Sequence, residues 1–348
     1  MKKYPHDGKV YRIPNKLNDF QLELYIHLIN YKWAQGDKEP GIFKNSEYDA
    51  MFPNNFDIHK LPIIYDEIRD IFIKHQKSCG FKLHKFVKHM ASSQAACANL
   101  FIPILKNRQF ASQILKSIKP DLKEIAFDYN PEIFDFGFRI EYSGEPEDTK
   151  NLLNDKTKAA GTDSDIAIAY YDKDHKLNLW LIEHKLSEKE FTSCGGYKST
   201  NNRSKYKCKS ISMTLDDSKN CYYHINCGYK YWDITKKHPE IFLLDNLREN
   251  GICPFKGGLN QLWRNQILAT AIEKSESPNL PFKKVFFSVV HHPQNTYLEK
   301  SISKFKKLIN NNDRFFTFTS DVIINEAQKI DEPELRRWTD WYKELYMI

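Results

Sequence analysis

Hydrophobic residues concentrate in four short segments after Pro120. Residues 134–143, 164–172, 177–186 and 283–292 are apolar, aromatic and β-branched runs of strand length. The link at 172–176, DKDHK, is short and polar, so we expect a hairpin between the second and third runs. Residues 144–163 read as a longer charged loop. The fourth run predicts that the sheet continues beyond a long intervening segment.

A second pattern, with apolar residues three to four positions apart, predicts helices. It recurs over 19–33, where Asn18 or Asp19 could cap the start. The other segments with this spacing are 61–75, 81–105, 259–273, 298–309 and 333–346. We therefore expect an α/β fold in which helices flank a mixed β-sheet. A mostly helical region covers 1–120, and the core covers 121–348 with a Cys-rich insert at 190–255.

Composition sets broad limits. The 348 residues are 41% hydrophobic and 14% aromatic, which is ample for a buried core. The formal charge of +7 mildly favours a polyanionic partner, with a solvated surface as the alternative. No run of about 18 apolar residues is present, and the N-terminus, MKKYPHDGKVYRIP, lacks the apolar stretch of a secretory signal. We expect a cytoplasmic protein without a membrane partner.

The most informative chemistry lies in the segment E-H-K at 183–185. A strand sends Glu183 and Lys185 to one face and His184 to the other. Two charged side chains on an apolar strand need a partner, which a divalent cation and a phosphate would supply. Asp165 opens the preceding strand, and a hairpin would bring it beside Glu183. The pair could then chelate one Mg²⁺ or Mn²⁺, with Lys185 next to the reacting phosphate.

The spacing of Asp165 and the E-H-K segment resembles that of the PD-(D/E)XK nuclease superfamily, and the resemblance covers about residues 134–292. It implies a restriction-endonuclease-like sheet. It also implies that Asp165 and Glu183 bind the metal ion and that Lys185 assists hydrolysis. Ser164 stands where the signature has Pro, which leaves these ligands intact.

Members of this superfamily often add an upstream acidic residue and a downstream helix with Gln or basic residues. Glu141 is our candidate for the upstream position, with Glu124 and Gln94 as alternatives. On the segment GGLNQLWRNQ (257–266), Gln261 is expected in the catalytic site. Two further residues of this segment are expected to contact DNA phosphate: Arg264 and Asn265.

Cysteines cluster between the two halves of the predicted sheet. Five fall within sixty residues, with His224 among them: Cys194, Cys208, Cys221, Cys227 and Cys253. Four of these ligands suit Zn²⁺, and several nucleases resembling this superfamily hold a [4Fe-4S] cluster instead. Partly buried free thiols are the alternative, and the spacing alone does not decide between the three.

Together these features predict a metal-dependent endonuclease that hydrolyses DNA phosphodiester bonds, in the manner of the restriction endonucleases that this stretch resembles. A homodimer would allow two sites to cut two strands. Two alternatives remain open at this point. One is a non-catalytic nucleic-acid-binding protein with a structural metal site, and the other is a DNA repair or junction-resolving nuclease.

Overall fold

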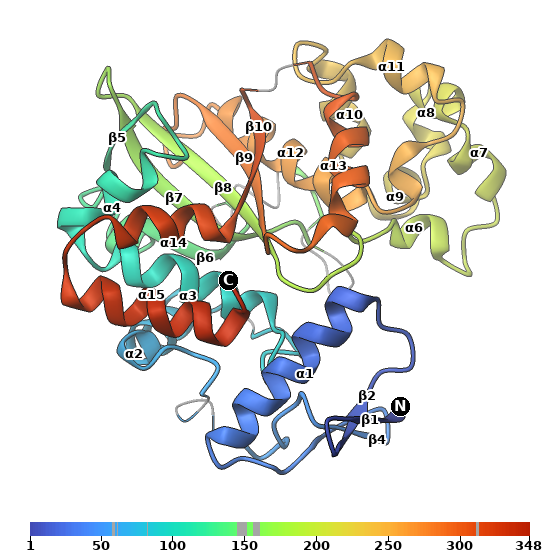
Figure 1. Cartoon of the computed structure of the whole chain (residues 1–348). Coiled ribbons are helices and arrows are strands. Elements are labelled where there is room, and N and C mark those ends of the chain that lie inside the picture. Colours follow the sequence, from blue (N-terminus) through green and yellow to red (C-terminus); the bar gives the residue numbers. More distant parts are fainter. Residues whose placement is uncertain (58–59, 61, 82, 145–151, 156–160, 311–312) are drawn as a thin grey trace.

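A mixed sheet of six strands lies at the centre of the described part of the chain (Figure 1). The computed structural model describes residues 1–57, 60, 62–81, 83–144, 152–155, 161–310 and 313–348. The strands follow each other across the sheet as β10 (Phe315–Thr319), β9 (Val285–His291), β8 (Leu177–Lys185), β7 (Ser164–Asp172) and β5 (Leu122–Ile125), and β6 (Phe138–Tyr142) also pairs with β7. Strands β8, β9 and β10 run parallel, whereas β7 runs antiparallel to β8, β5 and β6.

The central hairpin confirms the prediction from the hydrophobic runs. Strands β7 and β8 pair antiparallel from Tyr171 opposite Leu177 to Ile166 opposite Ile182. The Asp172 side chain closes the turn by accepting the backbone N–H groups of Asp174 and Lys176, both at 2.9 Å. Both strands are buried along nearly their whole length, as their continuous apolar runs predict.

Each face of the sheet has its own hydrophobic core. Ile166, Ile168, Trp180 and Ile182 pack on one face, while alternate residues such as Leu181 pack on the other. The first face is covered by α3 (Ser93–Leu105), α4 (Arg108–Leu115), α14 (Ser320–Gln328) and α15 (Pro333–Tyr346). The second face is covered by α12 (Asn260–Glu273), α10 (Tyr231–Lys237) and α13 (Glu299–Lys306).

The N-terminal part forms a small lobe beside the sheet, drawn in blue in Figure 1. It contains two short hairpins and one long helix: β1 (Lys2–His6) with β2 (Lys9–Ile13), β3 (Gly41–Phe43) with β4 (Ser46–Tyr48), and α1 (Asp19–Ala34). Asn18 caps α1 through a capping box with Gln21, so the predicted start is confirmed. The hairpins were not predicted, although Asp7-Gly8 is a strong signal for a two-residue turn.

Two predicted helices are wrong in extent. The helix expected over 61–75 is a short 3₁₀ turn, η2 (Asp66–Ile68), followed by α2 (Arg69–Cys79), and residue 61 lies outside the described residues. Residues 63–65 need no helix, because the buried amide of Asn99 bonds to the backbone of Ile63 and Tyr65. The helix expected over 81–105 begins only at Ser93, where Ser92 caps it.

The strand expected over 134–143 is also shorter than predicted. It begins with a 3₁₀ turn, η3 (Asp135–Gly137), in which Phe136 has a φ of 57°. The predicted charged loop at 144–163 lies largely outside the described residues. The predictions at 259–273, 283–292, 298–309 and 333–346 are confirmed by α12, β9, α13 and α15.

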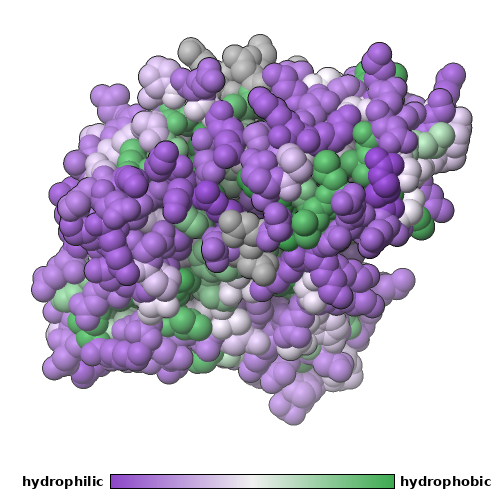
Figure 2. Space-filling model, turned by 90° about the horizontal axis from the view of Figure 1, so that it is seen from above, coloured by the Kyte–Doolittle hydropathy of each residue, from purple (hydrophilic) through white to green (hydrophobic). Residues whose placement is uncertain are grey.

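The segment between β8 and α12 contains short helices and turns rather than strands, and it projects to one side of the sheet (Figure 1). These elements are α6 (Gly195–Lys198), α7 (Lys205–Lys209), α8 (Ile211–Asp216), η4 (Ser218–Asn220), α9 (Tyr222–Cys227), α10, α11 (Leu244–Glu249) and η5 (Pro254–Lys256). The remaining 3₁₀ turn, η6 (Thr296–Leu298), leads into α13. The face of the molecule seen from above is mostly hydrophilic, with hydrophobic residues in groups between the hydrophilic ones (Figure 2).

Candidate active site

The hairpin of β7 and β8 brings the two predicted acidic residues together. Continuing the register of Ile166 opposite Ile182 by one residue sets Asp165 opposite Glu183, which makes them cross-strand neighbours on one face. Both residues, with Lys185, line a cavity of about 680 Å³ at this end of the strands. The geometry that the predicted site requires is therefore present.

Glu183 is held in a fixed orientation by three donors. The carboxylate is buried, with 3% of the residue exposed. Its Oε1 atom accepts hydrogen bonds from Lys185 Nζ at 2.7 Å and from Gln261 Nε2 at 2.6 Å. Its Oε2 atom accepts one from Asn265 Nδ2 at 2.9 Å. Helix α12 therefore presents two amides to β8, and both donate hydrogen bonds to Glu183.

Asp165 is half-buried, and its side chain is hydrogen-bonded to the backbone of the neighbouring strand β8. Its Oδ2 atom accepts the N–H group of His184 at 2.6 Å. Burial and the neighbouring carboxylates of Glu183 and Glu141 raise the pKa of Asp165 well above its ordinary value. A carboxyl group in such surroundings is stabilised as an anion once a cation binds beside it.

Glu141, the candidate for the upstream acidic position, lies in line with Asp165 and Glu183. The register of β6 with β7 sets Glu141 level with Asp165, so that carboxylates from three adjacent strands line up. Glu141 has a φ of 52°, a left-handed conformation that is rare in a strand. Its Oε1 atom accepts a hydrogen bond from Gln94 Nε2 at 2.7 Å, at the start of α3. Glu124 is exposed on β5, opposite Tyr171, and is not among the residues that line the cavity.

The charges around the cavity are unbalanced in favour of carboxylates. Burial and the charge of Asp163 raise the pKa of Glu141 to about 8. Burial also raises the pKa of Glu183, although Lys185 opposes the shift. Burial lowers the pKa of Lys185, but the carboxylates of Glu183 and Glu188 outweigh it and raise the pKa above its usual value. Lys185 stays an ammonium group beside several carboxyl groups, which leaves room for a further cation.

Three carboxyl groups and an aromatic wall of the cavity were missed in the sequence. The carboxyl groups belong to Asp163, Glu188 and Glu190, and the pattern D-S-D at 163–165 could have indicated the first. The opposite wall comes from the N-terminal lobe and the turns before α3, and it consists of Pro14, Tyr25, Phe43, Tyr48, Met51, His84, Phe86 and His89. Its rings pack in pairs, among them Phe43 on Phe86 at 5.0 Å between centroids. Such distant segments share no sequence motif.

The two residues expected to contact phosphate are engaged inside the protein. Asn265 is buried on Glu183. Arg264 donates from Nε to Thr162 Oγ1 at 3.0 Å and from its other nitrogen to the Gly161 carbonyl. Their contact with DNA stays a prediction.

The donor set fits a hard divalent cation. Among the described residues, no group of three or more His, Cys, Asp and Glu side chains is placed so that it could hold a metal ion by itself. A pair of carboxylates is nevertheless what Mg²⁺ uses when water and substrate oxygens complete its shell. Asp165 and Glu183 supply that pair at the wall of an open cavity.

The cysteines are all free thiols in the described structure. Cys194, Cys208, Cys221 and Cys253 line one small cavity in the insert, whereas Cys227 lies at the end of α9 and is not among the residues lining it. The structure thus separates four of the predicted ligands from the fifth.

Comparison with known proteins adds a family. No helix among the described residues is long and apolar enough to cross a membrane. The searches of curated proteins and of solved structures found no match. The model of the family described as "Restriction Endonuclease associating with ARP" matches residues 27–347. The match spans nearly the whole chain and includes Glu141, Asp165, Glu183, Lys185 and Gln261, so the chain belongs to this restriction-endonuclease-like family.

Proposed function

We propose that the protein is a metal-dependent endonuclease that hydrolyses phosphodiester bonds in DNA. The observation that carries this proposal is the pairing of Asp165 with Glu183 across β7 and β8, with Lys185 Nζ 2.7 Å from Glu183 Oε1 on the wall of the same cavity. The family supports the nuclease class. Magnesium dependence and DNA as substrate are part of the proposal.

Asp165 and Glu183 would hold the Mg²⁺ or Mn²⁺ ion. A bound divalent cation polarises a phosphodiester and lowers the pKa of water. The chain contributes the rest: Gln261 and Asn265 orient Glu183, and the Lys185 ammonium places positive charge where phosphate charge develops. Glu141 lies in the same row and adds a third carboxyl group.

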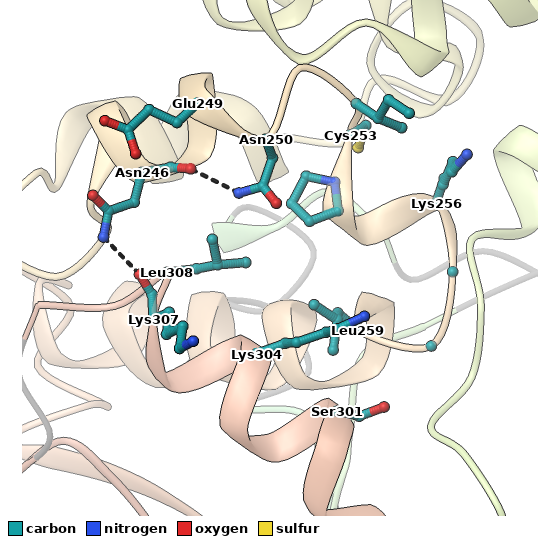
Figure 3. Close-up of a pocket in the computed structure, with 14 residues that line it drawn as sticks. Asn246, Glu249, Asn250, Cys253, Lys256, Leu259, Ser301, Lys304, Lys307 and Leu308 are labelled. Carbon is teal, nitrogen blue, oxygen red and sulfur yellow. Dashed lines mark hydrogen bonds between the residues drawn. The ribbon is translucent and has the colours of Figure 1, made fainter.

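A hollow beside the active-site cavity supports a polyanionic substrate. It has a volume of about 680 Å³, and three lysines line it against one acidic residue: Lys256, Lys304, Lys307 and Glu249 (Figure 3). The glycines at 257–258 line this hollow, and a side chain at 258 would touch the backbone of Phe191. Glu190, next to Phe191, lines the active-site cavity, so the two hollows adjoin. Lysines at this position suit a phosphate backbone leading away from the site.

The decisive experiment is a plasmid cleavage assay in Mg²⁺ or Mn²⁺. We expect cleavage by the wild-type protein, none in excess EDTA, and a loss of at least about 10²-fold in Asp165→Ala and Lys185→Ala, as for loss of a key electrostatic group. Glu124→Ala is the matched control, because this acidic residue lies exposed on the neighbouring strand β5. DNA binding without cleavage in every protein would favour a non-catalytic binding protein. Cleavage of branched but not linear DNA would point to a repair or junction-resolving nuclease.

We also propose that the enzyme acts as a homodimer, because one active site per strand is needed to cut both strands of an antiparallel duplex at once. The mass of the protein, measured by sedimentation with cleavable DNA at several protein concentrations, tests this. A monomer at every concentration that still makes double-strand breaks contradicts it.

A further inference from the structure

Four cysteines from four separate segments meet in the insert. Cys194 precedes α6, Cys208 lies in α7, Cys221 joins η4 to α9, and Cys253 precedes η5. Each of the four is buried, with at most 8% of the residue exposed. They line one cavity of about 10 Å³ that is walled by aromatic rings, among them Trp232, Phe255 and Trp263. Thiols scattered as small hydrophobic residues would not be expected to share one cavity.

A backbone donor points at the first of these sulfur atoms. Cys194 Sγ accepts the N–H of Tyr197 at 3.3 Å. Such a donor favours the thiolate, which is the form of cysteine that binds metal.

The backbone holds these positions next to each other. The N–H of Cys253 donates to the Lys209 carbonyl at 2.7 Å, and the N–H of Cys194 donates to the Lys256 carbonyl at 3.3 Å. Gly195 and Gly196 lie against Tyr223, where a Cβ at either position would come within 3.1 Å of the ring or its hydroxyl. The backbone contacts join Cys253 to the segments of Cys194 and Cys208, and the glycines bring the turn after Cys194 against the residues that follow Cys221.

We propose that Cys194, Cys208, Cys221 and Cys253 together bind one structural Zn²⁺ ion. Four thiolates in a tetrahedral arrangement are a standard structural zinc set, and each thiol that is protonated releases its proton to solvent on binding. The cavity has room for a single ion and not for a four-iron cubane, which favours zinc over an iron–sulfur cluster. Cys227, in the same insert, is not part of the set.

Coordination requires the four sulfurs to move toward the centre of this cavity, because no three His, Cys, Asp or Glu side chains of the described residues lie where they could hold a metal ion together. A cysteine places its sulfur through a single torsion, and the backbone contacts already hold the four segments together.

The proposed zinc would position the candidate active site through α12. Cys194 lies just after Thr192, whose N–H donates to Gln261 Oε1 at 3.3 Å. Cys253 begins the turn that leads into α12, which carries Gln261 and Asn265 onto Glu183. One ion would thus fix both ends of the insert, where the chain leaves β8 and where it enters α12.

The test is the metal content of the purified full-length protein. We expect about one zinc per chain in the wild type, as a closed four-ligand site holds one ion. Cys227→Ser, the matched control in the same insert, keeps the zinc. Cys221→Ser and Cys253→Ser lose it. A wild type without zinc overturns the proposal, as does a brown protein that contains iron and sulfide, or full zinc in Cys221→Ser.

A second measurement covers the case in which the serine variants fail to fold. Cobalt exchanged into the wild type gives thiolate-to-metal charge-transfer absorption only if sulfur ligands surround it, and we expect that absorption in wild type and Cys227→Ser alike. A zinc chelator should lower the melting temperature of both proteins, and added zinc should restore it. Cobalt without thiolate bands, or a melting temperature that the chelator leaves unchanged, overturns the proposal. Neither readout depends on nuclease activity.

Discussion

Glu183 shows how single residues prepare the candidate site. An ionised carboxylate buried to 3% exposure is unfavourable unless its oxygens are hydrogen-bonded. Lys185, Gln261 and Asn265 supply these bonds, and the two amides leave the charge of the site unchanged. The two amides therefore orient the carboxylate without neutralising its negative charge, which stays available to a cation.

Replacing Asn265 with Ala tests this orienting role. Glu183 Oε2 loses its donor, so we expect metal-dependent cleavage to fall about 10–100-fold and the half-saturating Mg²⁺ concentration to rise, as for other outer-shell partners of metal ligands. The circular dichroism spectrum should stay unchanged. Asn279→Ala, an exposed residue beyond α12, is the control. If Asn265→Ala lowers cleavage but leaves the Mg²⁺ dependence as in the wild type, the side chain does not act through Glu183.

A second residue links stability to pH. His75 lies buried in α2, where its ring stacks on Phe138 and Nε2 accepts the N–H of Ile140 at 3.2 Å. Burial lowers the pKa of His75 to about 4. The unfolded chain takes up the proton near its ordinary pKa of about 6.5, so the stability that neutral His75 provides is complete above that pH. It is lost as the pH falls from about 6.5 toward about 4.

We expect His75→Gln to reduce this pH dependence, because Gln keeps a hydrogen-bond acceptor and does not titrate. The free energy of unfolding, measured in urea at about pH 7 and at about pH 4.5, should drop less in the variant than in the wild type. Parallel losses in the two proteins would mean that His75 is not kept neutral by the fold.

At the level of elements, the sequence predicts those whose burial pattern is continuous. The β7–β8 hairpin could be predicted because both strands are uninterrupted apolar runs joined by a short polar link. Strands β5 and β10 could not, because β5 has only four residues and β10 is half-buried at the edge of the sheet. Helix α3 was predicted too long because the residues at 83–92 are apolar at helical spacing but form turns instead.

Helix α3 depends on one buried polar residue that links three elements. The Asn99 side chain accepts the N–H of Tyr65 at 3.0 Å and donates to the Ile63 carbonyl at 2.6 Å and to the Tyr346 hydroxyl at 2.9 Å. Its backbone carbonyl also accepts the Trp338 indole N–H at 2.8 Å. Asn99 therefore joins the turn before η2 and the C-terminal helix α15 to α3.

Asn99→Ala should destabilise the protein by about 2–4 kcal/mol, since buried partners lose their bonds at about 1–3 kcal/mol each. The loss will appear as a lower urea midpoint with little change in the dependence on urea concentration. Gln109→Ala, an exposed residue of α4, serves as the control. A loss below about 1 kcal/mol would mean that water replaces the amide.

At the scale of the whole molecule, the active-site cavity is a product of the fold. Strands β6, β7 and β8 supply one wall, and the N-terminal lobe and the turns before α3 supply the other. The pairing of Asp165 with Glu183 could be predicted from the motif, because strand periodicity and a short hairpin dictate it. Glu141 stayed one of three candidates, because a long loop separates β6 from β7. The aromatic wall and the hollow lined by Lys256, Lys304 and Lys307 (the lysine hollow) could not be predicted, because each is formed by segments that are far apart in the sequence.

The lysine hollow offers a test of how DNA would lie on the molecule. Lys304 and Lys307 face it from α13 and its end, whereas Lys300 and Lys306 lie on the same helix and are not among the residues that line it. If the DNA backbone crosses the hollow, Lys304→Ala with Lys307→Ala should weaken DNA binding and reduce the slope of log affinity against log salt by roughly 1.8, since each neutralised phosphate contributes about 0.9. Lys300→Ala with Lys306→Ala removes the same charge from the same helix and should change the slope little. Equal effects of the two pairs would show that only net charge matters, and that the DNA takes another path from the carboxylates.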